Sequence, residues 1–218
     1  MDLKAIAQDM NDVSEKLVSG GLVHLLGGNF SARTGNRMAI TGHASAKHRL
    51  TADDLFEVGV DSDENPSGIS STLGIHRAIL RRTNAGAIVH AHPYYATLLS
   101  YYTDHWSPID ENGIYYLGEA VHAVASEGYM KWALLEDELA ELLTHSTAAV
   151  LKWHGTFTIG KSLTEALNAT QAVELSARLI IDTHQLRSEL GDARLPNYAN
   201  ATRLTDADPQ TDRRQNCS

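Results

Sequence analysis

Two histidines lie two residues apart at the end of an apolar segment, residues 85–92, and a third follows another apolar segment. Side chains two residues apart in a β-strand point to the same face, so His90 and His92 can reach one ion. His154 precedes Gly155, which lets the backbone approach closely. Two strand-end histidines alone are equally consistent with hydrogen bonding to the backbone, but three neutral imidazoles are typical of a catalytic zinc. We therefore expect His90, His92 and His154 to bind a divalent metal.

Two polar segments have the composition of an anion site. Residues 27–31 read Gly-Gly-Asn-Phe-Ser, and such turns can expose backbone N–H groups to an anion. Residues 68–72 place three hydroxyl side chains at the start of a predicted helix, where free N–H groups suit phosphate or carboxylate. Taken singly, the first segment is also consistent with a simple turn and the second with N-capping.

The spacing of apolar residues predicts the elements that position these side chains. Strands and helices alternate, and several strands are joined by short turns, which favours a mixed α/β sandwich over a doubly wound parallel sheet. Helices are expected over residues 3–19, 71–82 (capped by Ser71), 94–102, 136–144 and 163–190, and strands over residues 38–41, 55–60, 85–92 and 148–153. Residues 108–112 are expected to form an acidic loop.

The composition limits the class of protein. Of 218 residues, 43% are hydrophobic and 21% charged, enough to bury a sizeable core. The net charge of −9 argues against nucleic acid or an anionic membrane as the main partner. The chain has neither a long apolar stretch nor a secretory signal, and the single cysteine, Cys217, fits a reducing cytoplasm. We expect one domain, residues 1–190, and a flexible polar tail, residues 191–218.

The order and spacing of these motifs resemble the class II aldolase/adducin-head family over about residues 3–185. The matching motifs are Gly27-Gly28-Asn29-Phe30-Ser31-Ala32-Arg33, the pair Ser70-Ser71 with His76 five residues later, residues 87–93 (Ala-Ile-Val-His-Ala-His-Pro), and His154-Gly155. As an ordered set they are much more specific than any one of them.

The resemblance implies a three-layer α/β/α sandwich with a central mixed, largely antiparallel sheet. It also implies a homotetramer with active sites at subunit interfaces, and zinc, or manganese or another divalent metal, on the three histidines. Four positions match those that hold the substrate's phosphate in this family: Gly28, Asn29, Ser70 and Ser71.

The chain departs from the family pattern at two positions. Family aldolases carry a glutamate after the Ser-Ser pair, as metal ligand and acid/base. This chain has Thr72, whose hydroxyl does not serve as an acid–base group near neutral pH. The loop that commonly reads Thr-Pro-Ser/Thr-Gly is here Thr-Gly-His-Ala-Ser, residues 41–45, so His43 could meet a carboxylate as well as a phosphate. Glu111 or Asp110 of a neighbouring subunit is a candidate substitute for the missing carboxylate, although a solvated loop is the preferred interpretation there.

The predicted function is a metal-dependent lyase that cleaves a C–C bond in a small hydroxy-carbonyl substrate, aldolase-type, through a metal-stabilised enediolate. The missing carboxylate favours an alternative, a decarboxylase of a hydroxy or keto acid, in which loss of CO₂ generates the carbanion without a base. A dehydratase, which would remove water from such a substrate, is a third alternative among metal-dependent lyases. A non-catalytic adducin-like module is a further alternative, but such a module has little reason to keep all three histidines.

Overall fold

The computed structural model describes residues 1–128 and 131–190. Its contacts divide the chain into two units, residues 1–181 and 182–218. The elements described below belong to the first unit, except for the end of the last helix, residues 182–190. The predicted tail, residues 191–218, lies outside the described residues. None of the helices described is both long and apolar enough to cross a membrane.

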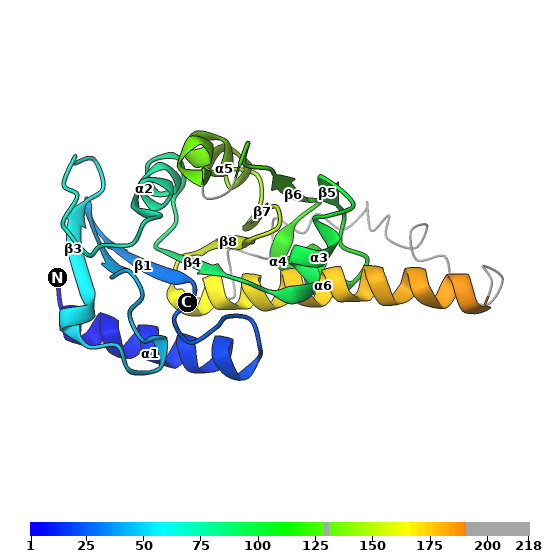
Figure 1. The fold of residues 1–218 in the computed structure, drawn as a ribbon, viewed down its shortest axis with the longest axis horizontal. Helices are drawn as coiled ribbons and strands as arrows, with labels where there is room; N and C mark the ends of the chain where they lie inside the picture. The colour runs from blue at the N-terminus through cyan, green and yellow to red at the C-terminus, as the bar shows by residue number, and fades with distance from the viewer. Residues whose placement is uncertain (129–130, 191–218) are drawn as a thin grey trace, which may run out of the picture. The chain divides into compact units, whose positions relative to one another are not determined.

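Six α-helices and eight strands form the described part of the chain (Figure 1). The α-helices are α1 Leu3–Ser19, α2 Leu73–Arg82, α3 Tyr94–Leu99, α4 Glu111–Leu117, α5 Glu136–Leu142 and α6 Leu163–Leu190. Three short 3₁₀ helices are η1 Lys47–Arg49, η2 Ala52–Asp54 and η3 Trp132–Leu135. The strands are β1 Asn29–Thr34, β2 Arg37–Thr41, β3 Leu55–Gly59, β4 Ala87–Ala91, β5 His105–Trp106, β6 Val121–Val124, β7 Ala148–Leu151 and β8 Gly155–Gly160.

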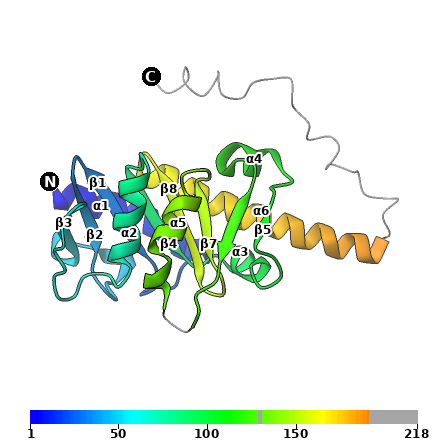
Figure 2. The ribbon, with the colours of Figure 1, turned by 90° about the horizontal axis from the view of Figure 1, so that it is seen from above.

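The strands make one sheet in the order β3-β2-β1-β4-β8-β7-β6-β5. Among the described strands, the pair β6–β7 is parallel and every other neighbouring pair is antiparallel. Helices α2 and α5 cover one face, and α1 and residues 163–181 of α6 lie against the other (Figures 1 and 2). The predicted three-layer α/β/α sandwich with a largely antiparallel sheet is therefore confirmed.

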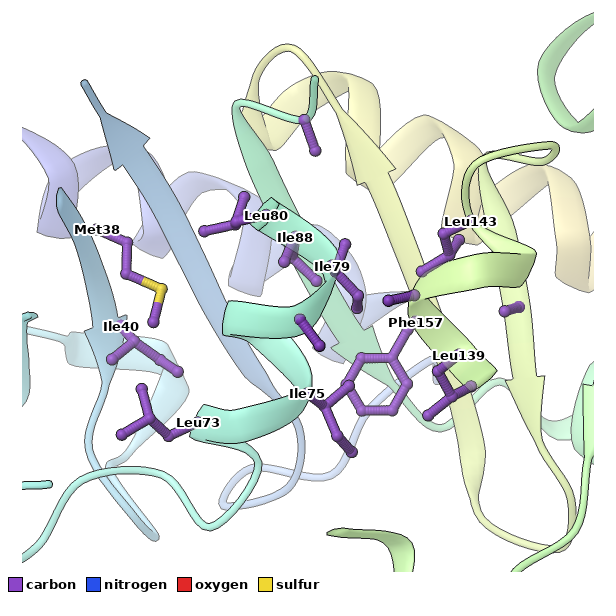
Figure 3. Close-up of a cluster of buried hydrophobic side chains, with 14 of the residues drawn as sticks. Met38, Ile40, Leu73, Ile75, Ile79, Leu80, Ile88, Leu139, Leu143 and Phe157 are labelled. Carbon is purple, nitrogen blue, oxygen red and sulfur yellow. The ribbon is translucent and has the colours of Figure 1, made fainter. Parts of the chain in front are cut away.

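The alternation of side chains along the central strands creates a separate apolar core on each face. In β4, Ile88 packs into the cluster under α2 and α5, while Val89 packs into the cluster under α1. Figure 3 shows the first cluster, with Phe157 of β8 between Ile75 and Leu139. His90 follows Ile88 by two residues, so the pleat places it on the α2 face of the sheet, beside Phe157, with ring centroids 4.2 Å apart.

The structure corrects several predicted elements. The predicted cap at Ser71 is wrong, because Thr72 occupies the N-cap position and α2 begins at Leu73. Residues 108–112 are not a simple loop. Asp110 is the N-cap of α4, and its Oδ1 accepts a hydrogen bond from the Gly113 amide at 2.7 Å. Strands β1, β5, β6 and β8 were not predicted, since they depend on long-range pairing more than on local pattern.

Candidate metal centre and anion pocket

The sheet brings the three predicted ligands together at one end of its central strands. His90 lies in β4, His92 immediately follows that strand, and His154 lies in the turn between β7 and β8. Because β8 pairs with both β4 and β7, this turn lies against the end of β4. One nitrogen from each histidine lies within 4.8 Å of the others, and the Nε2 atoms of His90 and His154 are 3.1 Å apart.

The hydrogen bonds of this triad fit a bound metal. His90 Nδ1 lies 2.9 Å from the carbonyl oxygen of Thr156, so Nδ1 carries the proton and Nε2 presents its lone pair to the other histidines. His92 Nε2 is buried and has no hydrogen-bond partner among the described residues. A buried nitrogen without a partner costs free energy, and coordination of a cation by this nitrogen would remove that cost.

The environment keeps these imidazoles neutral. Burial lowers the pKa of His90 well below its ordinary value, and the neighbouring His92 and His154 lower it further. Burial lowers the pKa of His92 to about 4 and also lowers the pKa of His154. Metal ligation requires neutral imidazole, so at neutral pH the triad does not have to lose protons before it binds a cation.

Two glycines permit the close backbone approach on which the site depends. A Cβ at Gly155 would lie 2.2 Å from the Ala91 carbonyl oxygen, which explains the glycine directly after His154. Gly28 has a φ of +66°, and a Cβ there would lie 2.5 Å from the His90 carbonyl oxygen. Both glycines therefore let neighbouring segments close on the strand that carries His90.

We expect Gly28→Ala to lower the free energy of unfolding by about 2–4 kcal/mol, because it adds a backbone clash to the strain of a positive φ. Gly21→Ala is the matched control, since Gly21 has a φ of +69° but open space around the Cβ position. Strain alone should cost that control about 1 kcal/mol. Urea denaturation measures both, and equal losses would contradict the close approach at His90.

A pocket of about 190 Å³ adjoins the triad and contains most of the predicted site residues. Its described lining consists of Leu26, Gly28, Asn29, Gly42, His43, Ala44, Ser70, Ser71, Thr72, His90, His92, Trp132 and His154. No carboxylate belongs to this lining. Glu111 begins α4, is exposed and does not line the pocket of its own chain.

A buried chain of hydrogen bonds determines how Asn29 faces the pocket. The Thr72 hydroxyl donates to Asn29 Oδ1 at 2.8 Å, and His76 Nε2 lies 2.6 Å from the same oxygen. The other ring nitrogen of His76 lies 2.7 Å from the Ser31 hydroxyl, and the Ser70 hydroxyl is 3.1 Å from that of Thr72. Because Asn29 Oδ1 can only accept, His76 carries its proton on Nε2 and accepts from Ser31 on Nδ1.

This network assigns clear roles to Asn29 and Thr72. Burial lowers the pKa of His76 to about 3, so the ring is neutral and acts as a fixed donor. With its oxygen held by His76 and Thr72, Asn29 has its Nδ2 amide group left as the donor for a ligand in the pocket. The Thr72 hydroxyl donates its proton to Asn29 Oδ1, and this hydrogen bond helps to hold the amide in that orientation.

We expect His76→Leu to weaken binding of inorganic phosphate about tenfold while zinc content stays at the wild-type level. The change leaves Asn29 Oδ1 with one donor, so the amide can turn its oxygen toward the anion. Isothermal titration calorimetry and metal analysis measure the two quantities, with the exposed His122→Leu as a control. Wild-type phosphate affinity in His76→Leu would rule out this orienting role.

Two features of the site gave little signal in the sequence. His76 was part of the recognised motif but had no assigned role, although its place four residues after Thr72 puts both side chains on one face of α2. Trp132 stacks on His154, with ring centroids 4.8 Å apart, and nothing in the local sequence marked it. It precedes α5 in the chain and reaches the site only through the fold.

Comparisons with known proteins find matches over most of the chain. Residues 8–181 match the model of the family described as Class II Aldolase and Adducin N-terminal domain. The chain is 31% identical over 157 residues to an L-fuculose phosphate aldolase from Methanococcus maripaludis, covering 70% of this chain and 83% of that protein. A methylthioribulose-1-phosphate dehydratase from Persephonella marina is 25% identical over 183 residues, covering 76% and 84% of the two chains. The crystal structure of L-fuculose-1-phosphate aldolase from Thermus thermophilus is 33% identical, with a TM-score of 0.77 and coverage of 85% and 98%.

Proposed function

This chain belongs to the class II aldolase and adducin N-terminal domain family, and on that basis we propose that it is a metal-dependent lyase. The substrate would be a small hydroxy-carbonyl compound with a phosphate or carboxylate, broken at a C–C bond. The observation that supports this most is that the histidine triad and the polar anion residues share one pocket. A non-catalytic module would not need that combination.

Class II aldolases depend on a divalent metal, and His90, His92 and His154 would hold it here, as zinc or as manganese. When bound, the cation would supply a Lewis acid that polarises the substrate carbonyl and stabilises the negative charge left by bond cleavage. The fit rests on the free Nε2 of His92 and on the proton that His90 keeps on Nδ1.

The chain's own residues would bind and orient the substrate. The Asn29 amide and the hydroxyls of Ser70 and Ser71 line the pocket as donors for a phosphate or carboxylate. His43 lines the same wall and can donate as well. Holding the anionic end at this wall would place the carbonyl end of a short substrate toward the triad, which is the positioning that a lyase requires.

The neutral Thr72 favours decarboxylation as a second candidate function. To form a carbanion from a ketose, an aldolase working in the synthetic direction needs a base, and no carboxylate lines the described pocket. In a decarboxylase, the electron pair of the breaking bond remains on carbon as CO₂ leaves, and a proton then adds to that carbon. This route needs a proton donor but no base.

We also propose that the chain forms a homotetramer with the pocket near subunit interfaces. Support comes from aromatic side chains that remain exposed beside the site: Trp153, next to His154, is 52% exposed, and Tyr101, in contact with it, is 58% exposed. A neighbouring subunit could then bring Glu111 toward the metal. Light scattering of the purified protein would measure the oligomeric state, and a monomer would contradict this proposal.

The proposed function can be tested by proton exchange and CO₂ release. Zinc-loaded protein is incubated with dihydroxyacetone phosphate in D₂O, and separately with a series of hydroxy and keto acids, with chelator-treated protein as the control. Metal-dependent deuterium at the hydroxymethyl carbon would support aldol chemistry, and metal-dependent CO₂ release would support decarboxylation. If protein that demonstrably holds zinc shows neither activity, the lyase assignment is overturned for these substrate classes.

A further inference from the structure

Lys47, the first residue of η1, is the most deeply buried charged side chain near the pocket. Its relative exposure is 0%, whereas lysine is almost never fully buried without a compensating charge. The ammonium donates to the Ser45 carbonyl oxygen at 2.9 Å and to the Ser45 hydroxyl at 3.1 Å. These are neutral acceptors, so they satisfy hydrogen bonds without balancing the charge.

No carboxylate forms an ion pair with Lys47 in the part of the chain that the structure describes. Asp54 is close enough to raise the pKa of Lys47, but its Oδ2 accepts hydrogen bonds from the backbone N–H and the hydroxyl of Thr51, both at 2.8 Å. Burial has the larger effect and lowers the pKa of Lys47 to about 8. The ammonium is therefore still mainly protonated at pH 7, although both of its hydrogen-bond acceptors are neutral.

The contacts of Lys47 place it behind two adjoining parts of the pocket wall. Its backbone N–H donates to the Leu25 carbonyl at 3.1 Å, and the next residue, Leu26, lines the pocket. Its ammonium holds Ser45, whose hydroxyl donates to the Gly42 carbonyl at 3.0 Å. Gly42 begins the run of three residues, 42–44, that lines the same pocket.

Apart from the divalent metal that the triad would hold, the described lining of the pocket offers an anion no permanently charged side chain. Its described lining includes neither lysine nor arginine, and its donors are amides, hydroxyls and imidazoles. A phosphate or carboxylate bound at these donors would bring negative charge close to the wall behind which the Lys47 ammonium has only neutral hydrogen-bond acceptors. A buried charge interacts over several ångströms because little water screens it.

We propose that Lys47 is a positioning residue that supplies, from behind the part of the wall formed by residues 42–44, a positive charge that helps to bind the anionic group of the substrate. This inference rests on the proposed function, since it requires an anion in the pocket. It explains why a lysine is buried without an ion pair, because the bound anion would be its partner. It also predicts a preference for charged over neutral substrates that the pocket's visible donors alone would not give.

The test compares binding of inorganic phosphate and of imidazole to zinc-loaded wild type, Lys47→Met and Lys47→Arg. Imidazole is a neutral ligand for zinc, so its affinity depends on the zinc held by the triad and not on the charge of Lys47. Methionine has a similar length, and replacing a buried unpaired charge by an apolar group is tolerated by many folds. Lys47→Gln provides a second neutral variant, so the comparison can still be made if Lys47→Met folds poorly.

We expect the neutral variants to bind phosphate about tenfold more weakly, Lys47→Arg to stay near the wild-type affinity, and imidazole affinity to be unchanged in all of them. Unchanged phosphate affinity in a folded neutral variant would overturn the role of Lys47 while leaving the proposed function intact. Equal losses for phosphate and imidazole would show a collapsed wall and would also overturn the charge role. Absence of phosphate binding by wild type would overturn this inference together with the anion pocket.

Discussion

His90→Ala should lose its bound divalent metal and more than about 100-fold of lyase activity, because it removes the ligand at the centre of the triad. His90 contacts both other histidines, its Nε2 lies 3.1 Å from that of His154, and its ring is oriented by the Thr156 carbonyl. Loss of a residue that only hydrogen-bonds to a metal ligand lowers metal affinity or activity about 10–100-fold. Removal of the ligand itself should lower both further. Metal content by mass spectrometry, measured beside activity, shows whether both fall together.

The matched control is His122→Ala, because His122 is exposed on β6 and lies outside the pocket. It should keep wild-type metal content and activity. A His90→Ala protein that folds and retains zinc would show that the metal binds elsewhere. A protein that loses zinc but keeps its activity would show that the triad is structural and would contradict metal-dependent catalysis.

Part of the triad could be predicted from local sequence, whereas His154 joins His90 and His92 only through the pairing of β8 with β4 and β7. A strand fixes the relation of His90 to His92, and a glycine after His154 indicates a close turn, as the 2.2 Å approach of a Gly155 Cβ to Ala91 confirms. Helix α1 was equally clear, since its apolar spacing and terminal glycines act within the segment itself. The three-layer sandwich came from the family resemblance more than from these local signals.

The remaining features depend on contacts that no local pattern encodes. The His76–Asn29–Thr72 network requires the β1–β4 register that sets Asn29 opposite His90, together with α2 packed over that pair. Sequence reasoning predicted that Thr72 is unsuited to acid–base chemistry, but could not show that its hydroxyl donates to the Asn29 side chain. The buried charge of Lys47 was missed for the same reason, because burial of a lysine is a property of the assembled fold.

Thr72→Glu should give the pocket the base that it lacks. The residue is 4% exposed, lines the pocket with the triad and occupies the position at which family aldolases are expected to carry a carboxylate. We expect zinc-loaded Thr72→Glu to exchange the hydroxymethyl protons of dihydroxyacetone phosphate about 100-fold faster than wild type, near the lower end of what a positioned general base contributes. Exchange in D₂O followed by NMR measures this rate.

Thr72→Gln is the control that separates charge from shape, since its side chain has the size of glutamate but cannot accept the proton. Both variants remove the threonine hydroxyl that donates to Asn29, and they differ from each other in the carboxylate. If the native reaction is decarboxylation, Thr72→Glu should release CO₂ more slowly than Thr72→Gln, because two carboxylates near each other repel. Equal exchange rates in the two variants would show that position 72 cannot reach the reacting carbon. The threonine would then leave the reaction type undecided, and the case for decarboxylation would lose its main support.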